Sequence, residues 1–197
     1  MVTATVRGEM QESYGSTEEV WQLPVDEENL LELFRDCFKE WEHINIGPLI
    51  QGAAWEIRPP REPKIYMYDG YATVNFEDWH FHICIGEHKQ ASPELQRIRP
   101  TAKAEIYRDL NDGAGNMWAI RLFNGADEQQ ITIILPSPFL SDDQRSLPEP
   151  DWSRLALWDR LRKKYLGLDP DPVDRAGKGF LHAGAPKPKA KEEGAAP

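Results

Sequence analysis

The chain has 197 residues, of which 40% are hydrophobic and 28% are charged, and its formal net charge is −10. This length suits one globular domain of roughly 150 residues with some tail to spare. Phosphate binding depends on clustered lysine and arginine, so the acidic balance argues against nucleic acid or an anionic membrane as a partner. Two cysteines are too few for a disulfide framework.

The lengths of the apolar runs in the sequence also bear on the cellular location. Residues 1–14 contain no apolar core of the kind that a signal peptide has. The longest apolar run, over residues 131–135, is far shorter than a membrane span of about 20 residues. We therefore expect a cytoplasmic protein with reduced thiols.

The first part of the chain predicts one helix and one short strand. Residues 1–22 are polar and weakly patterned, so we expect a loosely ordered N-terminal segment. Asp26 is a suitable helix cap, and apolar residues then recur at three- and four-residue spacing, which predicts a helix over 27–42. Residues 54–57 predict a short strand that ends before a proline-rich segment.

A β-rich section follows. Residues 65–76 are rich in Tyr, Val and Thr and predict strands, with Asp69-Gly70 as a turn or bulge. Residues 79–85 predict the next strand. Ser92-Pro93 is typical of a helix start, and because Pro100 interrupts that helix, we expect a second helix over 101–110.

The last part predicts a hairpin, a helix and a tail. Residues 117–123 and 129–135 predict the two strands of a hairpin. Residues 151–166 carry an apolar stripe at helical spacing, which predicts the final helix. From residue 169 to 197 the chain is rich in Pro, Ala and Lys and cannot bury enough apolar area to offset its ordering entropy, so we expect a disordered tail.

The predicted order is helix–strands–helix–hairpin–helix. Short turns between neighbouring strands favour an antiparallel sheet. The fold class that we expect is therefore α+β: a single domain over residues 23–168, with a mainly antiparallel sheet and helices packed on one face. The other sheet face is then open to solvent, a ligand or a partner.

The strand over residues 79–85 holds the strongest functional signal. Its period of two places His80, His82 and Cys84 on one face and the apolar residues on the other. Imidazole and thiolate are preferred ligands of zinc, copper and iron. Along a flat strand the α-carbons of His80 and Cys84 lie about 13 Å apart at a rise of roughly 3.3 Å per residue, which strains a single site.

Two sets of ligands remain open. One metal can take His80 with His82, or His82 with Cys84, and His88 could complete either set because Gly86 permits a turn. A further ligand has to come from elsewhere; the candidates are His43, Asp78 and Cys37. In the absence of a metal, His82 could instead activate the Cys84 thiol.

Other motifs are weaker. Arg121 lies between Ile120 and Leu122 on a predicted strand. It is either an edge or solvent-facing residue, or a buried guanidinium that needs a carboxylate or a ligand anion. Residues 113–115, Gly-Ala-Gly, lack the Gly-Lys-Ser/Thr ending of a phosphate loop, so no nucleotide cofactor is expected.

One stretch resembles a known family. Residues 65–86, the later Arg121-Leu-Phe-Asn-Gly and Leu135-Pro-Ser-Pro-Phe are similar to a bacterial family of unknown function, which would cover most of residues 25–168. The resemblance implies no activity.

Two functional hypotheses follow from these patterns. The first is a small metalloenzyme or metal-handling protein with an unknown substrate, which uses His80, His82, Cys84 and His88 and a transition metal such as zinc, iron or copper. The second is a non-catalytic accessory or interaction module. In this module the histidines are structural, and the open sheet face meets a protein partner or a second copy of the chain.

Overall fold

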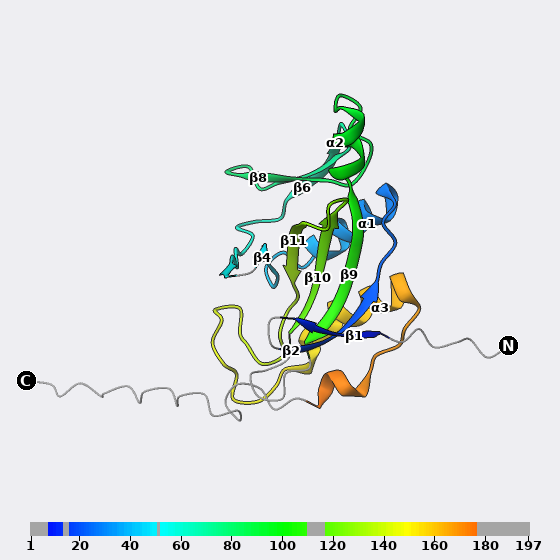
Figure 1. Ribbon diagram of the computed structural model, residues 1–197. Helices are drawn as coiled ribbons and strands as arrows, with labels where there is room; N and C mark the ends of the chain where they lie inside the picture. The colour runs from blue at the N-terminus through cyan, green and yellow to red at the C-terminus, as the bar shows by residue number, and fades with distance from the viewer. Residues whose placement is uncertain (1–7, 14–15, 51, 110–116, 177–197) are drawn as a thin grey trace, which may run out of the picture.

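A six-stranded antiparallel sheet forms the centre of the α+β fold in the computed structural model (Figure 1), which describes residues 8–13, 16–50, 52–109 and 117–176. Its strands, in spatial order, are β1 (Glu9–Ser13), β2 (Ser16–Gln22), β9 (Thr101–Asp109), β10 (Trp118–Asn124), β11 (Gln129–Ile134) and β3 (Asn45–Gly47). The hairpin predicted for β10 and β11 is confirmed, with Ile120 opposite Ile133.

Two smaller β-units complete the strands. A three-stranded antiparallel sheet consists of β6 (Lys64–Tyr68), β7 (Tyr71–Asn75) and β8 (His80–Cys84), and a short hairpin consists of β4 (Leu49–Ile50) and β5 (Ala53–Ala54). The turn predicted at Asp69-Gly70 joins β6 to β7. Both residues have positive φ (44° and 81°), the conformation that two-residue hairpin turns need and that glycine adopts most readily.

The first two α-helices begin at the predicted caps, Asp26 and Ser92. The helical elements are α1 (Glu27–Phe38), α2 (Pro93–Ile98), the 3-10 turn η1 (Trp152–Leu155), α3 (Ala156–Leu166) and the 3-10 turn η2 (Pro172–Arg175). The side chain of Asp26 accepts a hydrogen bond from the backbone N–H of Asn29, and Ser92 accepts one from Leu95. Each cap satisfies a donor that the first helical turn leaves free.

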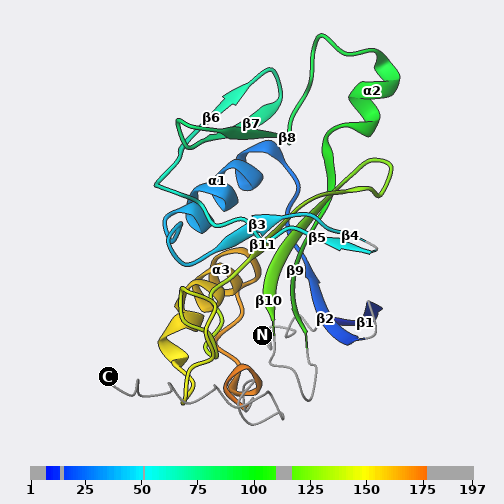
Figure 2. The same ribbon diagram turned by 90° about the vertical axis from the view of Figure 1, so that its left-hand side faces the viewer.

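The main core lies on one side of the six-stranded sheet, where α1 and α3 pack (Figure 2). The same core includes the inner face of the three-stranded sheet, because the Phe81 ring of β8 lies 6.5 Å from the Phe34 ring and 6.2 Å from the Phe38 ring of α1. Among the described residues, the opposite face of the six-stranded sheet carries a small buried apolar cluster of Val20, Tyr107 and Ala119, against which Met117 packs. We call this second side the open face; β4 and β5 lie on it.

One predicted helix is wrong. Residues 101–109 form β9, a central strand that pairs with β2 on one side and with β10 on the other. The Ala-Lys-Ala-Glu run at 102–105 favours a helix by intrinsic propensity. Two hydrogen-bonded neighbours and burial of Ile106 and Tyr107 override that local preference.

Both predicted unstructured ends also differ from the structure. Residues 16–22, expected to be loosely ordered, form β2, and Trp21 is buried opposite Ile106. In the segment expected to be a disordered tail, Asp174 of η2 is fully buried. It accepts hydrogen bonds from Arg108, Trp118, Trp158 and Arg162. Residues 177–197 lie outside the described part of the chain.

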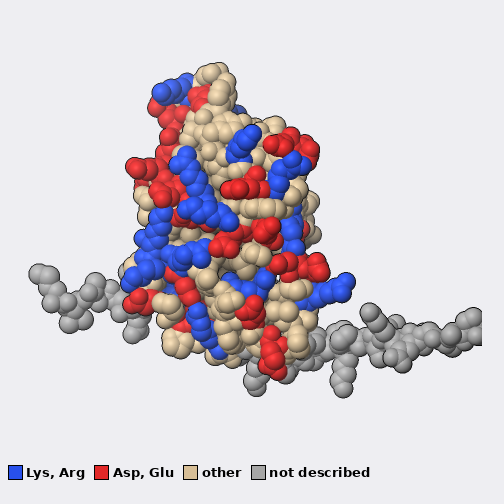
Figure 3. Space-filling view, turned by 180° about the vertical axis from the view of Figure 1, so that it is seen from behind, with Lys and Arg blue, Asp and Glu red and all other residues tan. Residues whose placement is uncertain are grey.

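Surface charges are paired rather than segregated. On the face shown in Figure 3, acidic and basic side chains alternate without an extended basic area. Lys164 of α3, for example, contacts both Glu32 and Asp36 of α1 at 2.6 Å. Within the described residues, no helix is both long and apolar enough to cross a membrane.

Candidate functional site

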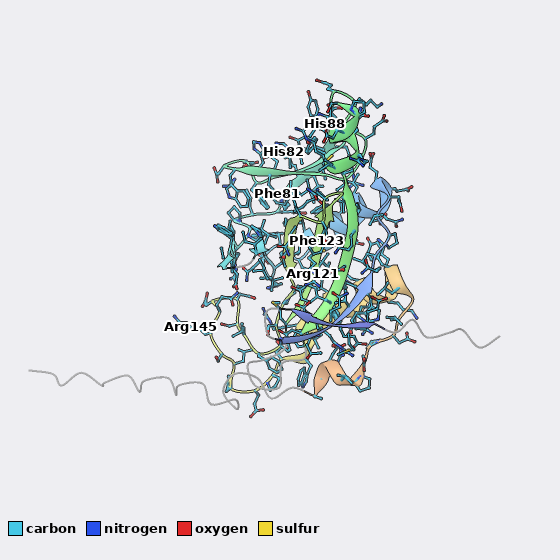
Figure 4. The ribbon with its side chains drawn as sticks, viewed as in Figure 1. Phe81, His82, His88, Arg121, Phe123 and Arg145 are labelled. Carbon is cyan, nitrogen blue, oxygen red and sulfur yellow. The ribbon has the colours of Figure 1, made fainter. Side chains whose placement is uncertain are left out.

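The alternation predicted for the histidine strand is confirmed. Phe81 and His82 lie on opposite sides of β8 (Figure 4). His80 and His82 are exposed, whereas Ile83 of the inner face packs in the main core. The inner face packs on α1, and the outer face of the three-stranded sheet presents His80 and His82 to solvent, whereas Thr73 and Cys84 on the same face are buried.

Two of the predicted ligands lie side by side. The ring centroids of His80 and His82 are 4.8 Å apart. His82 Nδ1 lies 2.9 Å from Oγ1 of Thr73, its cross-strand neighbour on β7. This contact fixes the orientation of the ring, and the Nε2 atom of His82 is then available to a ligand.

The other two predicted ligands are held elsewhere. His88 Nε2 lies 3.3 Å from an oxygen of Asp69, and Arg99 lies 3.0 Å from His88 Nδ1, so both ring nitrogens have partners. The Cys84 thiol lies 3.5 Å from the carbonyl oxygen of Gly86. Burial raises the pKa of Cys84, which opposes the thiolate that an activated nucleophile would need.

The candidates for a further ligand lie away from this strand. Asp78 is paired with Arg61, Cys37 is fully buried in the main core, and His43 contacts Asp142. Among the residues that the structure describes, no three His, Cys, Asp or Glu side chains are placed to hold one metal ion. The structure therefore brings His80 and His82 together and leaves Cys84 and His88 in other contacts.

A second polar cluster lies on the open face of the six-stranded sheet. Arg121 of β10 donates from Nε to Glu105 of β9 at 2.6 Å and from Nη1 to Glu18 of β2 at 2.8 Å. The exposed fractions of the three side chains are 8%, 3% and 5%, respectively. Of the two interpretations of Arg121, the buried guanidinium with carboxylate partners is the correct one.

The electrostatics of this cluster favour full ionisation of the arginine. Burial alone would lower the pKa of Arg121, but the hydrogen bond to Glu105 and the charge of Glu18 outweigh it and raise the pKa. The guanidinium also lies 4.4 Å from the centre of the Tyr107 ring, within the range of a cation–π contact. Burial, followed by the charge of Glu18, raises the pKa of Tyr107, so its hydroxyl keeps its proton at neutral pH.

A cavity of about 430 Å³ lies over this cluster. Glu18, Tyr107 and Arg121 line it from the sheet. Apolar side chains line it elsewhere, mainly from β4 and β5: Leu49, Ile50, Ala53, Ala54 and Met117. The side chain of Gln129 accepts a hydrogen bond from the backbone N–H of Leu49 at 2.8 Å, which ties the hairpin to β11.

Two donors at the cavity have no partner in the described part of the chain. Among the described residues, Arg121 Nη2 and the Tyr107 hydroxyl make no hydrogen bond, although both side chains line the cavity. The cavity thus combines apolar walls with a few convergent polar groups, the usual composition of a small-molecule site. Figure 4 shows Arg121 on the six-stranded sheet, well separated from His82 and His88.

Comparison with known proteins gives a family but no activity. A solved chain titled "Structure of the Heme Binding Protein ChuX" matches with a TM-score of 0.46 and 14% identity, over 72% of this chain and 74% of that chain. No curated protein matches the sequence. Residues 7–167 match the model of the "Family of unknown function (DUF7676)", which bears out the resemblance to an uncharacterised family. The chain belongs to this family of unknown function, DUF7676.

Proposed function

We propose that the protein binds a small molecule in the cavity on the open face of the six-stranded sheet. The observation that carries this proposal is the buried Arg121 cluster, which forms the floor of the cavity and leaves Nη2 of Arg121 without a partner among the described residues. A volume of about 430 Å³ falls within the range of roughly 300–1,000 Å³ that small-molecule sites occupy.

The energetics of the cluster favour a functional role over a structural one. Transferring three charged side chains from water costs several kcal/mol per ion, and their mutual attraction often only balances that cost. Well-packed apolar residues would stabilise the same position equally well. An ion cluster that is both buried and next to a cavity supports a role in recognition.

The lining of the cavity selects its ligand. Two of its described lining residues, Glu18 and Asp109, are carboxylates. An anion would meet these carboxylates in a partly dehydrated site, where like charges repel more strongly than in water. Arg121 Nη2 and the Tyr107 hydroxyl both offer a hydrogen, so the ligand is neutral, with a hydrogen-bond acceptor for these donors and an apolar body that lies against Leu49, Ile50 and Met117.

A matched series of probes tests this selection. 1-Naphthylmethylammonium, 1-naphthylmethanol and 1-naphthoate share one aromatic body and differ in charge. Titration calorimetry should give the tightest binding for the alcohol, which carries an acceptor and no charge. Binding should be at least about tenfold weaker for the ammonium, which has no acceptor, and for the carboxylate, which the lining carboxylates repel. Equal or tighter binding of naphthoate would contradict the proposal.

Three variants test the site. Ala53→Phe places a large side chain in the cavity and should weaken the binding of all three probes, whereas Ala126→Phe, in the exposed β10–β11 turn, should not. Glu18→Gln retains the shape of the side chain but removes one negative charge, so it should reduce the discrimination against naphthoate. Unchanged binding to Ala53→Phe would place the probes elsewhere.

The adjacent rings of His80 and His82 favour a second candidate, a metal-binding function on the outer face of the three-stranded sheet. Two imidazoles with one ring held by Thr73 supply two ligands, and water or a partner would complete the coordination. Cys84 and His88, also predicted as ligands, would have to leave their present contacts to join.

Copper(II) binding tests the metal site. Electron paramagnetic resonance should show nitrogen coordination in the wild type that is lost in His80→Ala and His82→Ala and kept in His88→Ala. If the nitrogen signals are unchanged in His82→Ala, His80 and His82 are not the pair that binds copper. Association with a protein partner or a second copy through the open face, like the cytoplasmic location, stays a prediction.

A further inference from the structure

A second cavity of about 170 Å³, which shares only Met117 with the described lining of the Arg121 cavity, lies where the loop after β11 folds back against the segment after α1. His43, Arg58 and Arg154 are among its polar lining residues, and Ile134 and Leu135 are among its apolar ones. A neighbouring cavity of about 590 Å³ also contacts His43 and Arg58. These two side chains therefore lie at the junction of the two cavities.

The loop that closes this cavity is well anchored. Ser141 donates its backbone N–H to the carbonyl of Arg145, and Leu147 donates to Phe139. Arg154 donates from Nε to the carbonyl of Ser137 at 2.9 Å. Figure 4 shows Arg145 on this loop, far from the three-stranded sheet. The cavity walls are thus held by hydrogen bonds at several points along the loop.

His43 is oriented by a carboxylate. Its Nδ1 lies 3.0 Å from Oδ1 of Asp142, and Arg154 Nη2 donates to the same oxygen at 2.7 Å. Burial opposes the ionised form of Asp142, but the hydrogen bonds from Arg154 and His43 outweigh it and lower the pKa of Asp142. The carboxylate therefore stays charged, and Nε2 of His43 makes no hydrogen bond to any described residue.

Arg58 supplies a positive charge to this junction. Its side chain is partly buried at the junction of both cavities, and it makes no hydrogen bond or ion pair with a described residue. Glu56, the acidic side chain that lines the same cavity, is exposed to solvent. The planar guanidinium of a partly buried arginine can donate two parallel hydrogen bonds to an anionic ligand when no carboxylate of the protein occupies it.

We infer that this cavity binds a short-chain monocarboxylate, with its carboxylate on Arg58 beside Nε2 of His43 and its hydrocarbon tail against Ile134 and Leu135. The volume of about 170 Å³ is below the roughly 300 Å³ at which drug-sized ligands begin, so the ligand is small. The apolar lining favours a hydrocarbon tail over a bare inorganic anion.

Pentanoate, pentanamide and inorganic phosphate separate these features. Pentanoate has the charge and the tail, pentanamide keeps only the tail, and phosphate keeps only the charge. NMR titration that follows the imidazole C–H signals of His43 should show saturable shifts with pentanoate and at least about tenfold weaker binding of the other two. Pentanamide lacks the charge-assisted hydrogen bonds to Arg58, and phosphate lacks the apolar tail. Equal binding of pentanamide or of phosphate overturns the inference, as does no binding of pentanoate.

Arg58→Gln identifies the contact, and Arg61→Gln is its matched control. Arg61 is three residues away, exposed, and paired with Glu77 and Asp78 instead of lining the cavity. Pentanoate affinity should fall at least about tenfold in Arg58→Gln and stay unchanged in Arg61→Gln. Equal affinity in the two variants contradicts the inference. Neither variant touches the Arg121 cavity, so this test and that of the naphthyl probes can fail independently.

Discussion

The two sheets of this molecule hold their polar side chains in opposite ways. On the three-stranded sheet, His80 and His82 project from an outer face into solvent. On the six-stranded sheet, Arg121, Glu18 and Glu105 are almost fully buried and bonded to one another beneath a cavity. The first site stands out by residue type, and the second stands out by burial, pairing and the space above it.

This difference has an energetic meaning. Exposed polar groups exchange hydrogen bonds with water at little cost, so their presence on a surface needs no special function. Buried charges carry a desolvation penalty that has to be offset by partners. Burial and charge therefore favour a site on the open face of the six-stranded sheet. Residue type alone favours the outer face of the three-stranded sheet.

The largest expected difference between the two sheets concerns their ion pairs. Arg121→Met leaves Glu18 and Glu105 buried without their main cation, which should lower the free energy of unfolding by about 3–5 kcal/mol. Arg61→Met, which breaks exposed ion pairs beside the three-stranded sheet, should cost no more than about 1 kcal/mol. Urea denaturation measures both; similar losses would mean that the Arg121 cluster is not desolvated.

Thiol reactivity sharpens the account of the histidine strand. Burial raises the pKa of Cys84, so at a given pH less thiolate forms than on an ordinary cysteine, and alkylation is slower. Cys84 of the folded protein should react with iodoacetamide more slowly than in urea at pH 8, because burial lowers both its thiolate fraction and its accessibility. Mass spectrometry of the Cys84 peptide follows the rate. Faster reaction of Cys84 in the folded state would support the hypothesis that His82 activates its thiol.

A pair of threonines compares the two sheets directly. Thr132, on the six-stranded sheet, is fully buried, and its hydroxyl has no partner among the described residues, so Thr132→Val should stabilise the protein by about 1 kcal/mol. Thr73 on β7 contacts His82, so Thr73→Val should destabilise by about 1 kcal/mol. Thermal denaturation shows whether each substitution raises or lowers the stability of the protein. Destabilisation by Thr132→Val would show that its hydroxyl has a partner such as bound water.

The smallest expected effect concerns the exposed histidine. His80→Ala should change the free energy of unfolding by less than about 0.5 kcal/mol, because an exposed side chain contributes little to packing. Phe81→Ala, on the inner face of the same strand, should cost about 3–5 kcal/mol and serves as the contrast. A large loss in His80→Ala would support the hypothesis that the histidines are structural.

Local pattern predicted much of the fold. Periodicity and caps correctly placed α1, α2, α3 and the β10–β11 hairpin, because each of these elements expresses its own signal in its own residues. β9 was missed because its identity as a strand comes from its two neighbours, β2 and β10, and its own residues 102–105 favour a helix. β2 and η2 were missed for the same reason: they are ordered by contacts with distant parts of the chain.

The candidate site was harder to predict. The alternation of β8 was readable, and so were the residue types of His80 and His82. The Arg121 cluster joins three strands whose members are 16 and 103 residues away from the arginine, so no local spacing reveals it. One signal was present: both Arg121 and Glu105 are flanked by apolar residues in runs that form strands. Opposite charges at such positions indicate a cross-strand pair, once the register is known.

Methionine methyl groups provide the most direct test of the central claim, that the ligand site lies on the open face. Met117 lines the Arg121 cavity, and Met67 of β6 packs against the core beneath the three-stranded sheet. Met117 also lines the smaller cavity, so Ala53→Phe serves as the control. In protein labelled at the methionine methyls, 1-naphthylmethanol should shift the NMR signal of Met117 in a saturable way in the wild type but not in Ala53→Phe, and should leave the signal of Met67 unchanged. A shift of Met67 with no change at Met117 would contradict the claim.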